Sequence, residues 1–146
     1  ISLQIPDYRI VRKLGSGAMG TVYEAEHLKL ARRVAIKVVR PEHARDPALE
    51  ARFVNEARAL ARVRHPSIVL IFEFGVLPDG TAYLVMEYVN GISLYSFSES
   101  FADRQLHVSQ AVDITMQVTQ ALAAAHAHGI VHREKSSWRL PVASAA

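Results

Sequence analysis

The stretch GSGAMGTVYEAEHL, residues 15–28, decides between two folds that use the same glycine pattern. Gly15, Gly17 and Gly20 form G-x-G-x-x-G, which opens a helix in a dinucleotide-binding fold. Here the β-branched and aromatic residues of TVYEAEHL predict a strand instead. The pattern therefore predicts a glycine-rich turn between two strands. Backbone N–H groups of such a turn can close over phosphates, although an ordinary flexible hairpin has the same sequence.

The rest of the chain predicts further strands first and helices afterwards. A turn at PDG, residues 78–80, separates the last two strands, and NG at 90–91 ends the strand region. Tight turns between successive strands indicate an antiparallel sheet, and hence the α+β class. The predicted strands are residues 8–14, 21–28, 32–39, 67–76 and 81–89, and the predicted helices are 46–64, 93–101 and 108–128.

The composition limits the possible functions. The chain has 146 residues, half of them apolar, and no cysteine, which excludes disulfides and thiolate metal sites. A net charge of +3 suits an anionic ligand but is too small to indicate nucleic-acid binding. No apolar run reaches the length of a membrane span. We expect a soluble, cytoplasmic domain without nucleic-acid partners.

Two charged residues lie where apolar ones are expected. Strand 32–39 alternates, so that Lys37 shares a face with the small Ala35, and Glu56 falls inside the apolar stripe of helix 46–64. A carboxylate on a buried stripe is costly unless it is paired. One interpretation pairs Glu56 with Lys37 beneath the glycine turn. The other leaves the lysine solvated and the glutamate at the stripe's edge, reaching water.

Six segments in order resemble successive signatures of the protein kinases: LGSGAMGTVYEAEH, VAIKVV, FVNEARAL, RHPSIV, YLVMEYVNGISL and HGIVHR. The residues in these segments are most similar to those of bacterial Ser/Thr kinases of the eukaryotic-like type. The resemblance covers residues 8–133, nearly the whole chain. It implies a small lobe of five antiparallel strands and one helix, followed by the first helices of a truncated large lobe.

The resemblance also implies a role for each matching residue. Lys37 would hold the α- and β-phosphates of ATP, with Glu56 as its ion-pair partner. Val22 and Ala35 would enclose the adenine, Met86 would be the gatekeeper, and Glu87 and Val89 would bind the adenine edge through their backbones. Leu60, Ile71 and His132 match positions of the hydrophobic spine between lobes. The implied ATP contacts are Leu14, Gly15, Ser16, Gly17, Ala18, Met19, Gly20, Val22, Ala35, Lys37, Met86, Glu87 and Val89.

The resemblance stops abruptly at the catalytic loop. His132 and Arg133 are followed by Glu134, where the family has a catalytic Asp, and then by KSSWRLPVASAA. The longer Glu would misplace a catalytic base, and a misplacement near 1 Å can cost on the order of 100-fold in rate. The Asn and the DFG motif that hold Mg²⁺ in the family do not occur, so the magnesium ligands are absent. We interpret the chain as a truncated or frameshifted kinase.

Three functions follow from this interpretation. The first is a kinase fragment that binds ATP with little or no phosphoryl transfer, divided into a small lobe (8–89), large-lobe helices (90–133) and an out-of-family tail (134–146). The second is an active kinase that uses Glu134 as its base. The third is a non-catalytic module that binds a partner kinase. Helix 108–128 would expose apolar surface that large-lobe residues cover in the family, so self-association is also expected.

Overall fold

A computed structural model describes residues 3–17, 20–39, 47–101 and 106–130, without the side chains of residues 47–50, 52, 53 and 56. The chain forms two compact units. The first unit contains residues 1–62 and 69–88, and the second contains residues 63–68 and 89–146.

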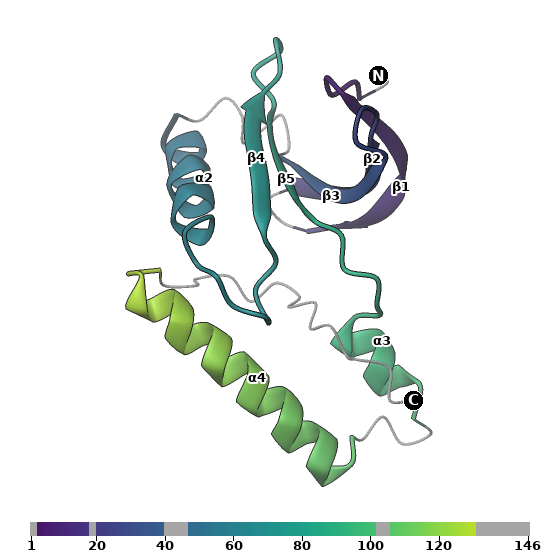
Figure 1. Ribbon diagram of the computed structural model, residues 1–146, viewed down its shortest axis with the longest axis vertical. Helices are drawn as coiled ribbons and strands as arrows, with labels where there is room; N and C mark the ends of the chain where they lie inside the picture. The colour runs from purple at the N-terminus through teal and green to yellow at the C-terminus, as the bar shows by residue number, and fades with distance from the viewer. Residues whose placement is uncertain (1–2, 18–19, 40–46, 102–105, 131–146) are drawn as a thin grey trace. The chain divides into compact units, whose positions relative to one another are not determined.

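The first unit is built on a five-stranded antiparallel sheet, shown in Figure 1. Its spatial order is β1-β2-β3-β5-β4, so the last strand along the chain lies between its two predecessors in space. The predicted antiparallel α+β architecture is therefore confirmed. The strands are β1 (Tyr8–Ser16), β2 (Gly20–His27), β3 (Arg32–Val39), β4 (Ile71–Val76) and β5 (Ala82–Glu87).

Two predicted boundaries were wrong by four residues each, and the other boundaries agree to within two residues. Strand β4 begins at Ile71 and not at residue 67, because the Ile68 N–H donates to the His65 carbonyl at 3.0 Å and closes a turn there. Helix α2 (Pro47–Leu60) ends four residues early. After it the Arg62 N–H bonds back to Ala59, a tighter i→i−3 bond that ends the helix. Val63, which falls inside the predicted helix 46–64, is thus buried outside the observed helix.

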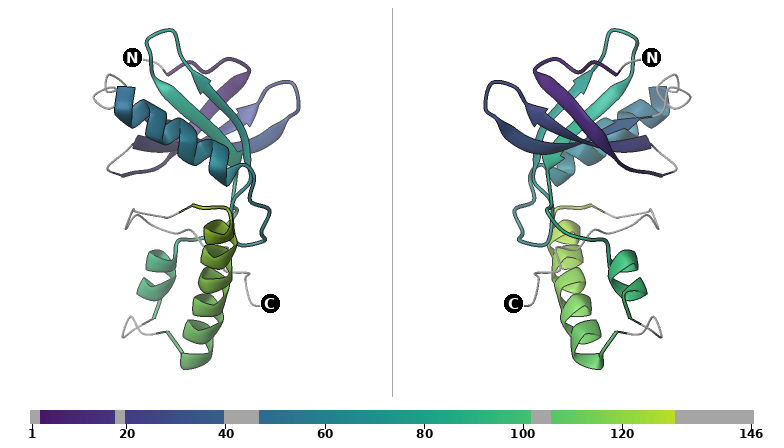
Figure 2. Two further views of the ribbon diagram at one scale, coloured as in Figure 1. Left: turned by 90° about the vertical axis from the view of Figure 1, so that its left-hand side faces the viewer. Right: turned by 90° about the vertical axis from the view of Figure 1, so that its right-hand side faces the viewer.

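The sheet has a core on each face, as the alternation of β3 predicts. On one face Val34, Ile36 and Val38 pack with Tyr83 and Val85 of β5. On the other face Val39 and Leu84 pack with Ala57 of α2. Helix α2 covers this second face, as Figure 2 shows.

The sheet curls so that its two edge strands, β1 and β4, meet through the carboxylate of Glu73. Glu73 of β4 accepts hydrogen bonds from the hydroxyls of Tyr8 of β1, at 2.8 Å, and Tyr83 of β5, at 3.3 Å. Burial, followed by these contacts with Glu73, raises the pKa of both tyrosines above the ordinary value of 10.0. The Tyr83 ring can lie here because Gly75 has no side chain: a Cβ there would stand 2.3 Å from the ring.

The described part of the second unit contains two helices, α3 (Leu94–Glu99) and α4 (Val108–Ala127). Ser93 caps α3 by accepting the Ser96 N–H at 3.1 Å, as a serine N-cap should. Gly129, directly after the predicted helix 108–128, has a positive φ of 73°, and the Ile130 N–H donates to the Ala125 carbonyl at 3.1 Å, so α4 ends before it. No helix in the described ranges is long and apolar enough to cross a membrane.

Helix α4 buries one side and exposes another. Ala121 and Ala125, four residues apart, are buried. Val108, Val112 and Met116 nevertheless remain exposed, at 81%, 50% and 55%. The helix therefore presents apolar side chains to solvent within the described part of this unit.

Candidate functional site

The antiparallel register gathers the predicted ATP-contacting residues of the sheet into neighbouring cross-strand rows. One row runs from Gly15 through Val22 and Lys37 to Leu84. Directly opposed residues in a sheet point to the same face. Leu84 packs in the core beneath α2, so this row lies on the face that α2 covers.

The next row on the same face contains Ala35, which is implied to enclose the adenine with Val22, and the implied gatekeeper Met86. Ala35 of β3 is opposite Met86 of β5, and on its other side it is opposite Glu24 of β2. Val22, Ala35, Lys37 and Met86, chosen from motifs far apart in the sequence, thus form one continuous patch. Small Ala35 is buried and Met86 is half-buried, which suits a flat apolar ligand better than a charged one.

The three glycines of the turn differ in whether their surroundings leave room for a side chain. Gly20 is buried at the start of β2, where a Cβ would lie 2.2 Å from the Val38 carbonyl oxygen. Gly17 donates its N–H to the Gly20 carbonyl at 2.9 Å, yet a Cβ on Gly17 would meet nothing within 4 Å. The sheet therefore requires a residue without a side chain at position 20, whereas no neighbouring atom requires one at position 17. A register shift in the β1–β2 pairing, between Lys13 and Gly15, places Gly15 opposite Val22.

Lys37 is half-buried in β3, between Val22 and Leu84 of the flanking strands. Its strand position and face agree with the prediction. Glu56 lies in α2, but its side chain is outside the described part of the structure, so the Lys37–Glu56 pair stays a prediction. Ala18, Met19, His132 and Glu134 are outside the described residues as well.

The segment that leaves β5 is anchored to the residue before β4. The Glu87 N–H donates to the Leu70 carbonyl at 2.8 Å, and the Glu87 carboxylate accepts the Leu70 N–H at 3.2 Å. Ile71, a predicted spine residue, packs with Met86 in the same core. Val89 belongs to the second unit, and its contact with adenine stays a prediction.

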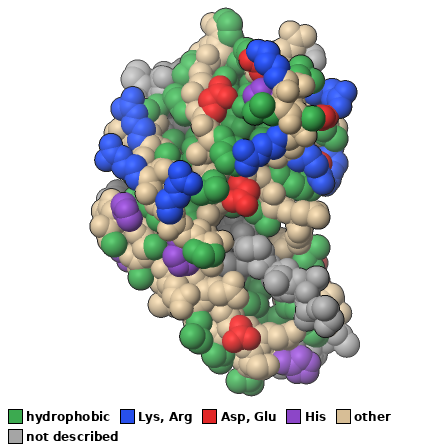
Figure 3. Space-filling model, in the orientation of Figure 1, with side chains coloured by type: hydrophobic (Ala, Val, Ile, Leu, Met, Phe, Trp, Pro, Cys, Tyr) green, Lys and Arg blue, Asp and Glu red, His purple; other side chains and the backbone are tan. Residues whose placement is uncertain are grey.

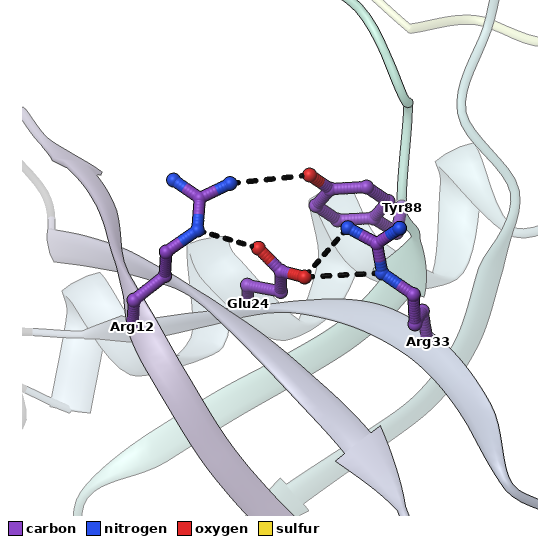
Figure 4. A network of polar contacts seen from close by, with 4 residues as sticks. All are labelled: Arg12, Glu24, Arg33 and Tyr88. Carbon is purple, nitrogen blue, oxygen red and sulfur yellow. Dashed lines mark hydrogen bonds and ion pairs between the residues drawn. The ribbon is translucent and has the colours of Figure 1, made fainter.

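A charged cluster that the sequence motifs did not predict lies on the same face as Ala35 and is drawn in Figure 4. Glu24, with only 5% of its surface exposed, accepts two hydrogen bonds from Arg33, at 2.6 and 3.0 Å. Arg12 forms an ion pair with its other carboxylate oxygen at 2.8 Å. The Arg33 guanidinium stacks 4.2 Å from the ring centre of Tyr88, and Arg12 donates to the Tyr88 hydroxyl at 3.4 Å. We call these four residues the hinge cluster.

The hinge cluster keeps Glu24 ionised. Hydrogen bonds from Arg33 are the main cause, and they hold the pKa of the Glu24 carboxyl below its ordinary value of 4.5. Burial acts in the opposite direction, and the positive charges of Arg33 and Arg12 add to the lowering. The same contact raises the pKa of Arg33. Alternation could have revealed the cluster, since Glu24 lies two residues beyond Val22 and Arg33 lies two before Ala35.

The basic residues of the described surface belong mainly to the first unit. Figure 3 shows Lys and Arg side chains in several separate groups over this unit. Helix α4 carries none, by its sequence VSQAVDITMQVTQALAAAHA. No group of three or more acidic or histidine side chains suited to a metal ion occurs among the described residues.

A family model described as a protein kinase domain matches residues 8–134. The chain belongs to the protein kinase family. This kinase sequence is 41% identical over 127 residues to the serine/threonine-protein kinase PrkC of Bacillus subtilis, and 42% identical over 131 residues to PknA of Mycobacterium tuberculosis. Each alignment covers 87% of this chain.

A solved kinase structure agrees with the fold. The crystal structure of the Mycobacterium tuberculosis PknI kinase domain superposes with a TM-score of 0.79 at 32% identity, covering 93% of this chain. The chain spans 54% of that solved chain, and only 19% and 30% of the lengths of PrkC and PknA. The predicted resemblance to bacterial Ser/Thr kinases is therefore confirmed, for a chain that corresponds to part of a kinase.

Proposed function

We propose that this chain is the nucleotide-binding part of a Ser/Thr protein kinase domain, and that these 146 residues by themselves bind ATP weakly and transfer little or no phosphate. Residues 8–89 would form the ATP-binding small lobe and residues 90–133 the first helices of the large lobe. Residues 134–146 would be a tail outside the family pattern. The observation that carries the proposal is the common face shared by Gly15, Val22, Lys37, Ala35 and Met86.

Each part of this face suits one part of ATP. Backbone N–H groups of residues 15–20, apart from that of Gly17, which bonds to the Gly20 carbonyl, would surround the phosphates, where the open space around Gly17 leaves room for them. Lys37 would neutralise the α- and β-phosphates, held by Glu56. Val22 and Ala35 would enclose the adenine, beside Met86. The backbones of Glu87 and Val89 would bind its edge.

Protein kinases use ATP and Mg²⁺, with ATP supplying the phosphoryl group and magnesium neutralising its charge. The proposed site supplies the ATP groups, but the sequence given after Arg133 shows no counterpart of the Asn and DFG motif that hold magnesium in the family. The binding energy of Lys37 and the turn therefore acts without its usual metal partner. We expect a dissociation constant of roughly 0.1–1 mM, equivalent to about 4–5.5 kcal/mol.

Thermal unfolding with and without ATP tests this binding. At about 10 mM ATP, a dissociation constant near 1 mM stabilises the folded chain by about 1.4 kcal/mol. Lys37→Ala should remove this stabilisation. Lys29→Ala is the matched control, because Lys29 is an exposed lysine paired with Asp7 at 2.7 Å in the same sheet unit. ATP stabilisation that persists in Lys37→Ala would place the nucleotide elsewhere.

A phosphoryl-transfer assay separates the remaining alternatives. The first alternative is an active kinase with Glu134 as base, which has a carboxylate directly after His132 and Arg133 in its favour. Transfer from labelled ATP to a Ser/Thr peptide at about 1 per second, abolished by Glu134→Gln, would establish it. We expect no transfer, and no rescue by Glu134→Asp alone, because the metal-binding residues would still be missing.

The second alternative is a non-catalytic module, supported by the exposed apolar residues Val108, Val112 and Met116 of α4. Such a module would bind a partner kinase, or a second copy of this chain, without needing ATP. It predicts no stabilisation by ATP in the unfolding assay. Sedimentation of the chain with and without Met116→Lys would then reveal association through α4.

A further inference from the structure

The proposed function leaves the hinge cluster unused, although it borders the face assigned to adenine. Arg12, Glu24, Ala35 and Met86 form one cross-strand row, so the cluster occupies two positions of the row that contains Ala35, a proposed adenine contact, and the proposed gatekeeper Met86. Arg33 precedes Ala35 by two residues on the same strand face. Tyr88, the cluster's fourth member, follows β5 directly and is the last residue of the first unit.

A local irregularity in β1 makes the cluster possible. The regular ladder that pairs Ile10 with Ala25 would place Arg12 opposite Tyr23, on the other face of the sheet. The register shift between Ile10 and Arg12 places Arg12 opposite Glu24 instead. Such bulges commonly redirect a side chain next to a functional site. The backbone is thus arranged to bring a second guanidinium to this one carboxylate.

Stability alone does not explain a nearly buried carboxylate with two arginines. Well-packed apolar residues often serve a fold equally well or better, because removing charges from water is costly. What the charges supply is direction: Glu24 fixes both guanidinium groups, and these hold the Tyr88 ring by stacking and the Tyr88 hydroxyl by a hydrogen bond. Leu70 holds the neighbouring Glu87 through two hydrogen bonds.

We propose that the hinge cluster is a positioning device. It holds the backbone at Glu87 and Tyr88 in a fixed orientation, and thereby makes the nucleotide site prefer adenine over other purines. This inference deepens the proposed function and rests on it. Arg12, Glu24 and Arg33 act through Tyr88 and are positioning residues, because their contacts are with one another and with that side chain.

The chemistry of the purine edge gives the preference. At position 6 adenine carries an amino group, which donates a hydrogen bond to a backbone carbonyl, whereas hypoxanthine carries a carbonyl oxygen there. A carbonyl held in place rejects the second base, because two acceptors then face each other without a hydrogen. A backbone free to reorient can present an N–H group and accept both bases. Removing the contacts that hold Tyr88 should therefore reduce the preference for adenine over hypoxanthine more than it weakens binding of the phosphates.

The first test needs no nucleotide. Amide hydrogen exchange at Glu87, whose N–H bonds to Leu70, should become at least tenfold faster in Arg33→Ala, relative to amides of central strand β3. Arg9→Ala is the matched control, since Arg9, like Arg33, pairs with a glutamate of β2, in this case Glu26, but lies on β1. Unchanged relative exchange at Glu87 in Arg33→Ala, or an equal increase in Arg9→Ala, would overturn the positioning role.

The second test compares ATP with inosine triphosphate, which has the same ribose and phosphates. In NMR titrations, which reach millimolar dissociation constants, the parent chain should bind ATP more tightly. Arg33→Ala and Tyr88→Ala should each raise the dissociation constant of ATP at least threefold. The dissociation constant of inosine triphosphate should change by less than twofold. Tyr88→Phe keeps the stacked ring and should retain most of the preference.

The outcomes separate this inference from the proposed function. Equal loss of both nucleotides in Arg33→Ala, or no preference in the parent chain, would overturn the specificity role. If the parent chain binds neither nucleotide, the proposed function fails, and with it the specificity role. The exchange experiment still decides whether the cluster holds the backbone.

Discussion

Replacing Gly20 with alanine should damage the sheet, whereas the same change at Gly17 should leave it intact. An added Cβ on Gly20 would stand 2.2 Å from the Val38 oxygen, 3.0 Å from the Val38 carbonyl carbon and 3.3 Å from Val39 Cα. Ordinary contact for a Cβ begins at 3.4 Å. Because all three neighbours are backbone atoms, no side-chain rotation can relieve the overlap, and β2 and β3 must move apart.

The size of the effect follows from overpacking. Extra methyl groups in well-packed regions typically cost about 1–3 kcal/mol. We expect the upper part of this range for Gly20→Ala, since backbone and not side chain must move. At Gly17 a Cβ meets nothing within 4 Å. Gly17→Ala should change the free energy of unfolding by no more than about 1 kcal/mol, and in the stabilising direction if its backbone angles suit alanine.

Urea unfolding of the two variants, followed by circular dichroism, measures this difference. Gly20→Ala should lower the midpoint at an unchanged slope, and Gly17→Ala should not. Gly17→Ala should still weaken ATP binding several-fold, because its methyl group enters the space assigned to the phosphates. Destabilisation of Gly17→Ala by 2 kcal/mol or more, or a fully stable Gly20→Ala, would refute the division between a structural and a ligand-binding glycine.

Three further predictions concern the first unit. Ile36→Ala, at a side chain with 0% exposure, should lower the free energy of unfolding by about 2–5 kcal/mol in urea titrations, and a loss below 1 kcal/mol would contradict the described core. Because Arg33 holds the pKa of Glu24 below 4.5, the stability that this carboxylate contributes is present above pH 4.5 and is lost as pH falls through its folded-state pKa, so Glu24→Gln should flatten acid unfolding in that range. Because burial and Glu73 raise the pKa of Tyr8, the free energy of unfolding should fall as pH rises above 10.0. In an absorbance titration, the ionisation of Tyr8 should occur at a lower pH in Glu73→Gln than in the parent chain.

Much of the sheet could be predicted because its strands follow simple alternation. Strand β3 has the predicted bounds, since RRVAIKVV is rich in β-branched residues and its two faces fill two cores. The common face of Val22 and Lys37 follows from antiparallel pairing once the hairpin is known. The resemblance to kinase motifs also assigns Val22 and Lys37 to the ATP site.

Other features depend on contacts that local sequence does not encode. The irregularity in β1 that places Arg12 opposite Glu24 shifts the register by one residue, and no glycine or proline marks it. The end of α2 at Leu60 and the start of β4 at Ile71 depend on turn hydrogen bonds between them. The meeting of Tyr8 with Glu73 requires the curl of the whole sheet.

Mapping ATP binding by two-dimensional NMR tests the central claim most directly. On addition of ATP, amide signals of Gly15, Gly17, Val22, Lys37 and Glu87 should shift together and saturate with one dissociation constant of roughly 0.1–1 mM. The same titration of Lys37→Ala should show little or no shift, with the spectrum of the sheet otherwise preserved. Shifts confined to residues outside this face, or micromolar binding that survives Lys37→Ala, would contradict the assignment of the nucleotide site.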